Sequence, residues 1–386
     1  MNVVIIGAGV AGLGIGWKLA RAGASVTVLE RAQVGNGATA ASGGMIAAAV
    51  ELGRAQTPEA VLARQASALW PAFKDTLEAE SKIEIGYRRN GAMVVRMRSD
   101  TGAAEPVLSG VFELLDADEA RILEPLLGDG VAGAVLAPQE GEVDSQALCR
   151  ALAVAFVRAG GAVLSNETAV RFEYDGTRIT GVATPFAVHR ADAYVIAMGA
   201  WSARIEGLPR EVVPPVVPVK GEMAVLTPPP GAPLPSHVVW GNGIYAVPRR
   251  DRLLIGATME LAGFDTNVTQ TALRWLYRQS TTMMPELKSW RLTGHWAGLR
   301  PCAPDRLPLL GETAIPGLYV ASGQFRNGIL FAPAIAEGLS RLILERTPLD
   351  AAFDPRRFAT TVPELSLAET PHREARDEAG AWRTGS

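Results

Sequence analysis

The first thirty residues of this 386-residue chain constrain its fold more than any other segment. An apolar run over residues 2–6 leads into a glycine-rich segment that contains Gly7, Gly9 and Gly12. A second apolar run follows and ends at Glu30. This order of strand, glycine-rich turn, helix and strand is typical of a βαβ unit that binds a dinucleotide.

Each residue type in this motif has a physical role. Gly7 permits a tight turn, Gly9 lets the backbone approach a pyrophosphate, and Gly12 lets the helix pack closely on the sheet. The start of the helix offers N–H groups and a partial positive charge to phosphates. Glu30 is placed to accept hydrogen bonds from ribose hydroxyls, and its charge would repel the 2′-phosphate of an NADP-type ligand.

The composition excludes several classes of protein. Hydrophobic residues make up 48% of the chain and the net charge is −3, which fits a globular protein without a basic nucleic-acid-binding stripe. No apolar run reaches the roughly 18 residues of a membrane span, so no integral membrane association is expected. The two cysteines and four histidines lack metal-ligand spacing. We therefore expect no metal site, and we expect a cytoplasmic location.

Hydrophobic periodicity and turn residues predict the secondary structure. Helices are expected over 45–53, 59–80, 145–159, 269–283 and 334–344. Strands are expected over 93–97, 162–166, 169–174, 178–183, 191–198, 222–226, 238–240, 244–247, 253–257 and 317–323. A proline-rich link is expected over 214–218, the region 106–140 receives no clear assignment, and the polar tail from about 366 is expected to be flexible.

This distribution predicts two interleaved domains. Patterns of the βαβ type occur at both ends and near 145–202, whereas antiparallel strands fill the intervals. We expect an α/β nucleotide-binding domain of the Rossmann type and an interleaved α+β substrate domain with an antiparallel sheet. The first takes residues 1–83, 145–215 and 298–365, the second takes 84–144 and 216–297, and 366–386 form the tail.

Four segments of the second half narrow this interpretation. They are Ile244–Arg249, Leu254–Met259, Gly298–Asp305 followed by Pro308–Gly311, and Gly323–Ile329. Together with the opening motif, they resemble the D-amino-acid oxidase superfamily of FAD-dependent amine oxidases, and within it the glycine oxidase family. The resemblance extends over roughly residues 2–348, and it implies FAD as the cofactor.

The resemblance assigns catalytic roles to three residues. Arg300 matches the arginine that holds the substrate carboxylate, a role that suits a planar guanidinium; its alternative is a surface ion pair. Tyr245 matches a tyrosine that turns its hydroxyl to the substrate, and its alternative is a packed strand aromatic. Arg326 would line the pocket or orient the flavin, and its alternative is a salt bridge.

The resemblance also implies which residues contact FAD. Gly323–Ile329 would pass the flavin ring, Gly43–Met45 would flank it, and Gly199 with Trp201 would form a second nucleotide-contacting turn. The expected set is Gly7, Gly9, Val10, Ala11, Gly12, Glu30, Arg31, Ala41, Gly43, Gly44, Met45, Val170, Gly199, Trp201, Arg300, Gln324, Arg326, Asn327, Gly328 and Ile329.

Two positions bear on how the flavin is held. Gln324 stands where the family commonly has histidine, so the flavin environment or the reaction with oxygen is expected to differ. Cys302 invites a covalent attachment, but the covalent cysteine of sarcosine-oxidising relatives lies earlier relative to the Pro-Asp pair. Non-covalent FAD is therefore expected.

The implied reaction is oxidative deamination of glycine, sarcosine or a small D-amino acid. A hydride would pass from the substrate Cα to the flavin, the resulting imine would hydrolyse to a 2-oxo acid with ammonia or an amine, and oxygen would become hydrogen peroxide. The family's glycine oxidases are associated with thiamine biosynthesis, and homotetramers are common among relatives. The alternatives are a D-amino-acid or sarcosine dehydrogenase that reduces a quinone or carrier, and an FAD-binding subunit without its own turnover.

Overall fold

The computed structural model describes residues 1–52, 56–99, 112–365 and 367, and its first large feature is a six-stranded sheet. The strand order is β18-β19-β12-β1-β2-β8, and all neighbours pair in parallel except β18 with β19. This order, with β1 near the centre, confirms the predicted Rossmann-type sheet. The strands are β1 (Asn2–Ile6), β2 (Ser25–Glu30), β8 (Ala162–Ser165), β12 (Ala193–Ile196), β18 (Leu309–Glu312) and β19 (Leu318–Ser322).

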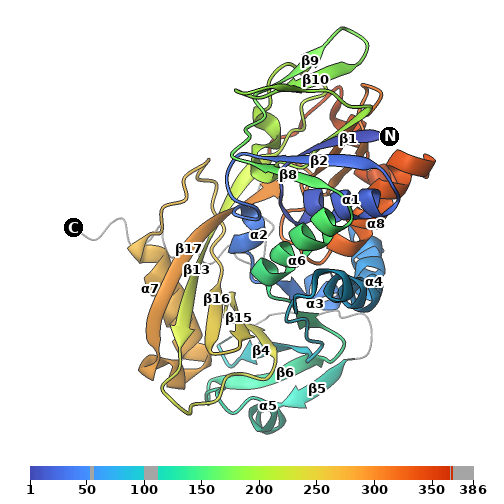
Figure 1. Ribbon diagram of the computed structural model, residues 1–386. Coiled ribbons are helices and arrows are strands. Elements are labelled where there is room, and N and C mark those ends of the chain that lie inside the picture. Colours follow the sequence, from blue (N-terminus) through green and yellow to red (C-terminus); the bar gives the residue numbers. More distant parts are fainter. Residues whose placement is uncertain (53–55, 100–111, 366, 368–386) are drawn as a thin grey trace.

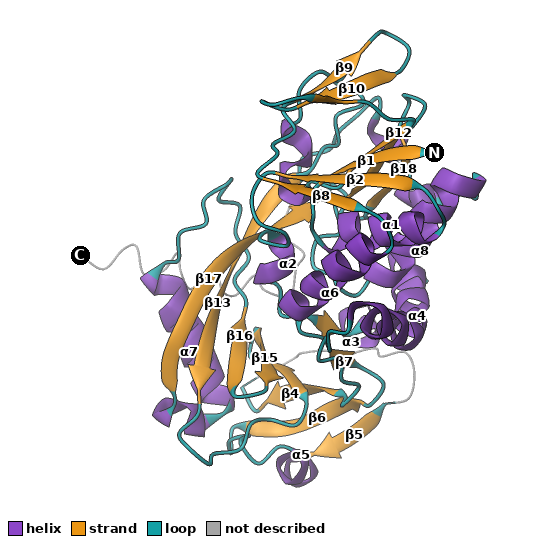
Figure 2. Ribbon diagram, viewed as in Figure 1, coloured by secondary structure: helices purple, strands orange, loops and turns teal. Residues whose placement is uncertain are grey.

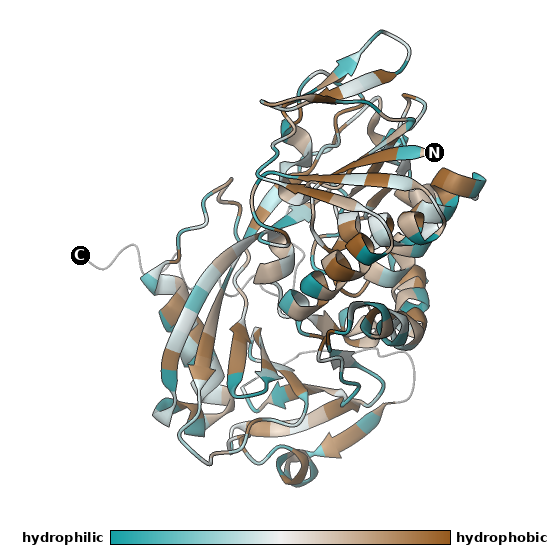
Figure 3. Cartoon of the chain, viewed as in Figure 1, coloured by the Kyte–Doolittle hydropathy of each residue, from teal (hydrophilic) through white to brown (hydrophobic). Residues whose placement is uncertain are grey.

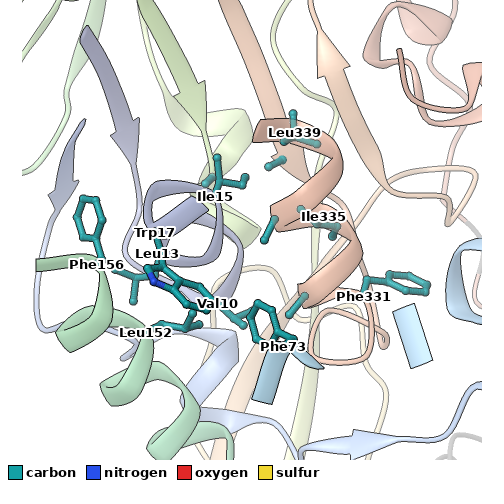
Figure 4. Close-up of a cluster of buried hydrophobic side chains, with 14 of the residues drawn as sticks. Val10, Leu13, Ile15, Trp17, Phe73, Leu152, Phe156, Phe331, Ile335 and Leu339 are labelled. Atoms are coloured by element: carbon teal, nitrogen blue, oxygen red, sulfur yellow. The ribbon is translucent and has the colours of Figure 1, made fainter. Parts of the chain in front are cut away.

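Helices cover one face of this sheet in two layers (Figures 1 and 2). The inner layer holds α1 (Val10–Arg21), α6 (Ser145–Arg158) and α8 (Ala332–Glu345), and α4 (Pro58–Ser81) packs outside α6 and α8. Figure 4 shows the apolar side chains that join these layers, among them Trp17, Phe156 and Ile335. The ring centroids of Trp17 and Phe73 lie 5.4 Å apart in an edge contact, which ties α1 to α4.

The opposite face of the sheet is covered by a small antiparallel sheet. Its strands are β9 (Arg171–Tyr174), β10 (Ile179–Ala183) and β11 (Val188–His189), in the order β11-β10-β9. Phe172 and Val182 from this sheet pack with Val4 and Tyr194 of the large sheet. Burial on both faces explains why β1 and β12 read as apolar runs. In Figure 3, β1 is brown over most of its length.

A second large sheet has eight strands in the order β17-β13-β16-β15-β14-β4-β6-β5. Its neighbours pair antiparallel, as predicted, except that β14 and β4 run parallel. Helices α7 (Gln270–Met283) and α5 (Ala117–Leu123) flank this sheet (Figure 1). Its strands are β4 (Ala92–Met97), β5 (Glu113–Asp116), β6 (Val131–Ala137), β13 (Val217–Thr227), β14 (Val238–Gly241), β15 (Ile244–Arg249), β16 (Arg252–Gly256) and β17 (Arg291–Cys302).

Several expected elements differ from those observed. The helix expected over 45–53 is wrong at its start, because β3 (Met45–Ile46) pairs with β7 (Gly141–Glu142) and α3 covers only Ala48–Leu52. The expected strand 222–226 is part of the longer β13, which takes in Pro218 from the expected proline-rich link, and β17 was not expected as a strand. Residue 366 and residues 368–386 of the expected flexible tail lie outside the described residues.

The two large sheets draw on different parts of the chain. Strands of the six-stranded sheet lie in 1–83, 145–215 and 298–365, whereas β4–β6 and β13–β16 lie in 84–144 and 216–297. Strand β17 begins in the second group and continues through residue 298. We propose a division into two domains that follows the two sheets. Among the described helices, none has the length and apolar character needed to cross a membrane.

Candidate active site

A cavity of about 520 Å³ lies between the two sheets, at the carboxyl ends of β1 and β2. This is where ligands bind in open α/β sheets. The structure brings nearly all the predicted site residues to its wall, although they come from distant parts of the chain. These residues are Gly7, Gly9, Val10, Ala11, Glu30, Arg31, Ala41, Gly43, Gly44, Met45, Val170, Gly199, Trp201, Tyr245, Arg300, Gln324, Arg326, Asn327, Gly328 and Ile329.

Gly12 is the predicted residue that does not line this cavity. A Cβ atom at Gly12 would lie 2.0 Å from the carbonyl oxygen of Gly7, so this glycine faces the sheet. Gly7 itself has a φ of +108° and lies against Ala197, where a Cβ atom would lie 2.4 Å from the carbonyl oxygen. These two glycines allow α1 to begin close to the end of β1, which directs the start of the helix at the cavity.

The start of α1 is also fixed by a residue that the sequence did not single out. Thr39 lies on α2 (Ala38–Ala41), lines the cavity, and accepts a hydrogen bond from the Val10 N–H at 3.1 Å through its hydroxyl. Gly9 caps the helix without a side-chain hydrogen bond of its own. Only the fold brings Thr39 to α1, and no local motif marks it.

Glu30 and Arg31 occupy the wall at the end of β2. The Glu30 carboxylate accepts hydrogen bonds from the N–H groups of Ala8 at 2.9 Å and Ala32 at 3.0 Å, and its remaining lone pairs can still accept from a ligand. The Arg31 guanidinium stacks 3.6 Å from the centroid of the Trp201 ring. Burial lowers the pKa of Arg31 and the charge of Glu30 opposes that shift.

The segment Gly43–Met45 is held against the cavity by Arg249. The Nη2 atom of Arg249 donates to the carbonyl oxygens of Gly43 at 2.5 Å and Val143 at 2.9 Å. Its Nη1 atom pairs with Glu142, a fully buried carboxylate that also pairs with Arg88. Arg249 lies within one of the segments that carry the resemblance, but no local pattern predicts this role for it.

Arg300 on β17 and Tyr245 on β15 meet at the other end of the cavity. The Arg300 Nη1 atom donates to the carbonyl oxygens of Thr258 at 3.1 Å and Lys220 at 3.4 Å. No carboxylate of the described residues forms an ion pair with Arg300, so its charge is available to a ligand. Burial lowers the pKa of Arg300, but a guanidinium titrates far above neutral pH and stays charged. Burial raises the pKa of Tyr245, which keeps its phenol protonated near neutral pH.

Two glycines make room for the Tyr245 ring. A Cβ atom at Gly256 would lie 2.5 Å from the ring and one at Gly43 would lie 3.1 Å from it. The Tyr245 hydroxyl lies 3.8 Å from the sulfur of Met223, which also lines the cavity. The Tyr245 ring and the Met223 side chain therefore form part of the wall beside Arg300.

Two alternatives were expected for Arg326, a place on the cavity wall or a salt bridge, and the structure shows both. Arg326 lines the cavity, and its Nη2 atom forms a salt bridge with Glu51 of α3, at 2.8 Å from Oε2 and 3.0 Å from Oε1. The next residue, Asn327, donates from its amide to Glu59 at 3.1 Å, and burial raises the pKa of that carboxyl group. Neither Glu51 nor Glu59 was predicted as a site residue, because neither lies in a recognisable motif.

The chemistry of this wall fits FAD. It offers a glycine-lined helix N-terminus for phosphates and a carboxylate at the end of β2 for ribose hydroxyls. The Gln324 side chain adds a buried Nε2 donor that has no hydrogen-bond partner among the residues that the structure describes. Cys149 and Cys302 lie outside the wall, and burial raises the pKa of each thiol to about 12, which fits non-covalent binding.

Known proteins match this chain along nearly its whole length. The family model for FAD dependent oxidoreductases (DAO) matches residues 2–342. The glycine oxidase of Pseudomonas aeruginosa is 34% identical, over 93% of this chain and 98% of that protein. The crystal structure of glycine oxidase from Geobacillus kaustophilus has a TM-score of 0.83 at 33% identity, and the match covers 91% of this chain and 97% of that one.

One further relative is longer than this chain. The bifunctional protein ThiO/ThiG of Synechocystis sp. is 34% identical over 93% of this chain, which spans only 54% of that protein. The family model, which matches residues 2–342, and the FAD-compatible cavity both indicate the same family as these relatives do. The chain belongs to the DAO family of FAD-dependent oxidoreductases and is an FAD-dependent amine oxidoreductase.

Proposed function

We propose that this protein is an oxidase of glycine, sarcosine or small D-amino acids. The products are a 2-oxo acid, ammonia or an amine, and hydrogen peroxide. The observation that carries the proposal is Arg300, a buried guanidinium on the cavity wall whose described partners are neutral groups, two carbonyl oxygens and the Tyr245 hydroxyl. A buried cation without a protein counter-ion is a natural partner for a substrate carboxylate.

The residues around Arg300 support the binding of a small substrate. Arg300 would hold the carboxylate through N–H donors of its guanidinium, and Tyr245 would add a hydroxyl donor from β15 of the same sheet. The side chains of Met223 and Tyr245 are buried and line the cavity, so they add apolar surface beside the carboxylate position. Bound FAD supplies the two-electron acceptor.

The names of the relatives favour this substrate class. The glycine oxidases that match over nearly their full length carry their substrate in their names, and the longer relative is called ThiO/ThiG. We therefore propose a glycine oxidase activity with a role in thiamine biosynthesis. A cytoplasmic location and a homotetramer stay predictions, which cell fractionation and light scattering would check.

An aerobic peroxide assay tests the proposed activity. The purified holoenzyme is given glycine, sarcosine, D-alanine, L-alanine and methylamine, and peroxide formation is followed. We expect turnover with one or more of the first three and none with methylamine, which has no carboxylate for Arg300. Turnover of methylamine at a comparable kcat/KM would contradict the role of the carboxylate.

The acceptor distinguishes the oxidase from the dehydrogenase alternative. The substrate-reduced protein is mixed with air-saturated buffer in a stopped-flow instrument, and flavin absorbance is followed. Rapid reoxidation is expected of an oxidase, whereas reduced flavin that persists for minutes in air would favour a dehydrogenase that reduces a quinone or carrier. If no small amine bleaches the flavin under anaerobic conditions, a non-catalytic FAD-binding subunit becomes the better account.

A further inference from the structure

Three charged groups form one cluster at the substrate end of the cavity. Arg300, Arg326 and Glu51 all line the cavity. Glu51 belongs to α3 and forms an ion pair with Arg326. The Arg326 guanidinium lies 6.0 Å from the centroid of the Trp240 ring, and that ring lies 5.3 Å from the Tyr245 ring, so the Arg326–Glu51 pair is close to Tyr245 and Arg300. The side chains of Glu51 and Arg326 are only 8% and 18% exposed, so solvent screens this pair weakly.

The cluster contains two cations and one anion, and the anion, Glu51, pairs with only one of the two arginines. Arg326 has a carboxylate partner at 2.8 Å, whereas Arg300 is held by carbonyl oxygens. Glu59 lies behind the wall and accepts its hydrogen bond from Asn327. The substrate end of the cavity therefore presents one uncompensated positive charge, that of Arg300.

We propose that Glu51 is a specificity-determining residue that restricts the substrate to a single carboxylate, because its ion pair occupies the charge of Arg326. This inference rests on the proposed function and adds a rule to it. A substrate with a second carboxylate must bring that group close to Glu51 and compete for an arginine that is already paired. Without the Glu51 charge, Arg326 becomes a second carboxylate site.

Ligand binding tests this rule without turnover. Acetate and malonate are titrated into the oxidised holoenzyme at about pH 8, where both malonate carboxyl groups are ionised. Their Kd values are measured by calorimetry and by the change in flavin absorbance. We expect Glu51→Gln to tighten malonate binding by ~10-fold or more relative to acetate. This is the effect expected when the second malonate carboxylate gains one ion pair with Arg326. An unchanged ratio of the two Kd values would overturn the inference.

A matched control separates the cavity effect from the loss of a carboxylate in general. Glu337 of α8 pairs with Lys18 at 2.8 Å and does not line the cavity. The variant Glu337→Gln makes the same chemical change outside the site, so the ratio of malonate to acetate Kd should stay as in the parent protein. A similar change of ratio in Glu337→Gln would remove the special role of Glu51.

A second variant makes the test independent of how well Glu51→Gln folds. In Arg326→Gln the unpaired Glu51 carboxylate faces Arg300, and acetate binding should weaken by ~10-fold. The double variant Glu51→Gln with Arg326→Gln again presents one cation, so acetate affinity should return toward that of the parent protein. Acetate binding that is as weak in the double variant as in Arg326→Gln would contradict the charge rule.

Turnover then links the rule to substrate choice. The value of kcat/KM for iminodiacetate relative to sarcosine should rise by ~10-fold in Glu51→Gln, in line with the binding data. Failure of the proposed function is a different result: ligand selectivity would be present, but no amine in the panel would yield peroxide. Selectivity of the parent protein that does not depend on Glu51 would instead overturn the inference alone.

Discussion

Arg300 carries a buried positive charge that the described protein groups do not neutralise. Its Nη1 atom donates to two backbone carbonyl oxygens, which orient the guanidinium and leave its other N–H groups to a ligand. A cation in this setting pays a desolvation cost that a bound carboxylate can recover. Arg326 has the same side chain, but Glu51 compensates it, so residue type alone does not separate their roles.

We predict that Arg300→Ala raises KM for the amino-acid substrate far more than it lowers stability. The expected loss of binding is about 2–5 kcal/mol, because one partner of a buried charge pair is removed. No protein carboxylate is left unpaired, so Tm should change little. Arg300→Lys keeps the charge but loses the planar, two-pronged guanidinium, so its KM should lie between those of the parent protein and Arg300→Ala. Steady-state kinetics and thermal unfolding check this, and an unchanged KM would exclude Arg300 from the substrate site.

Glu140 gives a pH-dependent prediction. Its Oε1 atom accepts from the Ala49 N–H at 3.0 Å, its Oε2 atom has no partner, and burial raises its pKa from 4.5 to about 7. The folded state therefore binds the proton more tightly than the unfolded state, and stability falls as pH rises from about 4.5 to 7. Above about 7 this contribution is constant.

The variant Glu140→Gln removes this ionisation and preserves the acceptor for Ala49. Relative to the parent protein, we expect the variant to gain roughly 3 kcal/mol in unfolding free energy between pH 5 and pH 8, since each pKa unit is worth about 1.4 kcal/mol. Chemical denaturation at both pH values measures the gain. If the two proteins keep the same stability difference at both pH values, burial does not perturb Glu140 in this way.

At the scale of elements, the close approach of α1 to β1 depends on Gly12. A Cβ atom there would meet the Gly7 carbonyl oxygen at 2.0 Å, a backbone atom that cannot move aside without shifting the strand end. Gly14 is a useful comparison in the same helix, because its Cβ would meet the Ala336 side chain at 3.2 Å. Both substitutions to alanine gain helix propensity equally, so their difference reports the clash.

We predict that Gly12→Ala destabilises the protein by about 1–3 kcal/mol and weakens FAD retention, whereas Gly14→Ala costs less. The physical reason is that α1 must move away from the end of β1, which shifts its N-terminus relative to the cavity. Denaturation of both variants and flavin occupancy after dialysis provide the measurements. Equal stability and equal occupancy in the two variants would show that the approach at Gly12 is not limiting.

Local patterns predicted some elements better than others. The helix 145–159 was predicted correctly, because Asp144 caps it through the N–H groups of Gln146 and Ala147 and its apolar face repeats regularly. The helix predicted over 45–53 begins three residues later in the structure, at Ala48, because Met45 and Ile46 pair with β7 instead. That pairing is a long-range contact, and the small residues of the segment suit either structure.

At the scale of the whole molecule, Arg249 joins the eight-stranded sheet to the two-stranded β3-β7 sheet and to the segment before β3. It ends β15 in the eight-stranded sheet, and its guanidinium binds the carbonyl oxygens of Gly43 and Val143 and the carboxylate of Glu142. Glu142 is fully buried, and its other partner, Arg88, is about half exposed. These contacts hold the Gly43 segment, which lines the cavity, to the end of β15.

We predict that Arg249→Ala lowers stability by about 2–4 kcal/mol, because Glu142 keeps only its solvent-exposed partner. FAD retention should also weaken, since the Gly43 carbonyl loses its donor. Adding Glu142→Gln removes the buried charge and should recover part of the stability but not the flavin retention. Thermal unfolding and flavin release measure the two effects, and full recovery of both would argue against a role for the Gly43 contact.

The sequence by itself determined the Rossmann-type βαβ unit, because strand, turn and helix signals lie within short windows and glycine spacing reflects local sterics. Its resemblance to a family, carried by segments such as Gly323–Ile329, implied FAD and the residues that face the cavity. Only the tertiary structure decided how those residues are paired. Arg326 and Glu51 lie 275 residues apart and Arg249 and Gly43 lie 206 apart, so their contacts depend on sheet packing that no local pattern encodes.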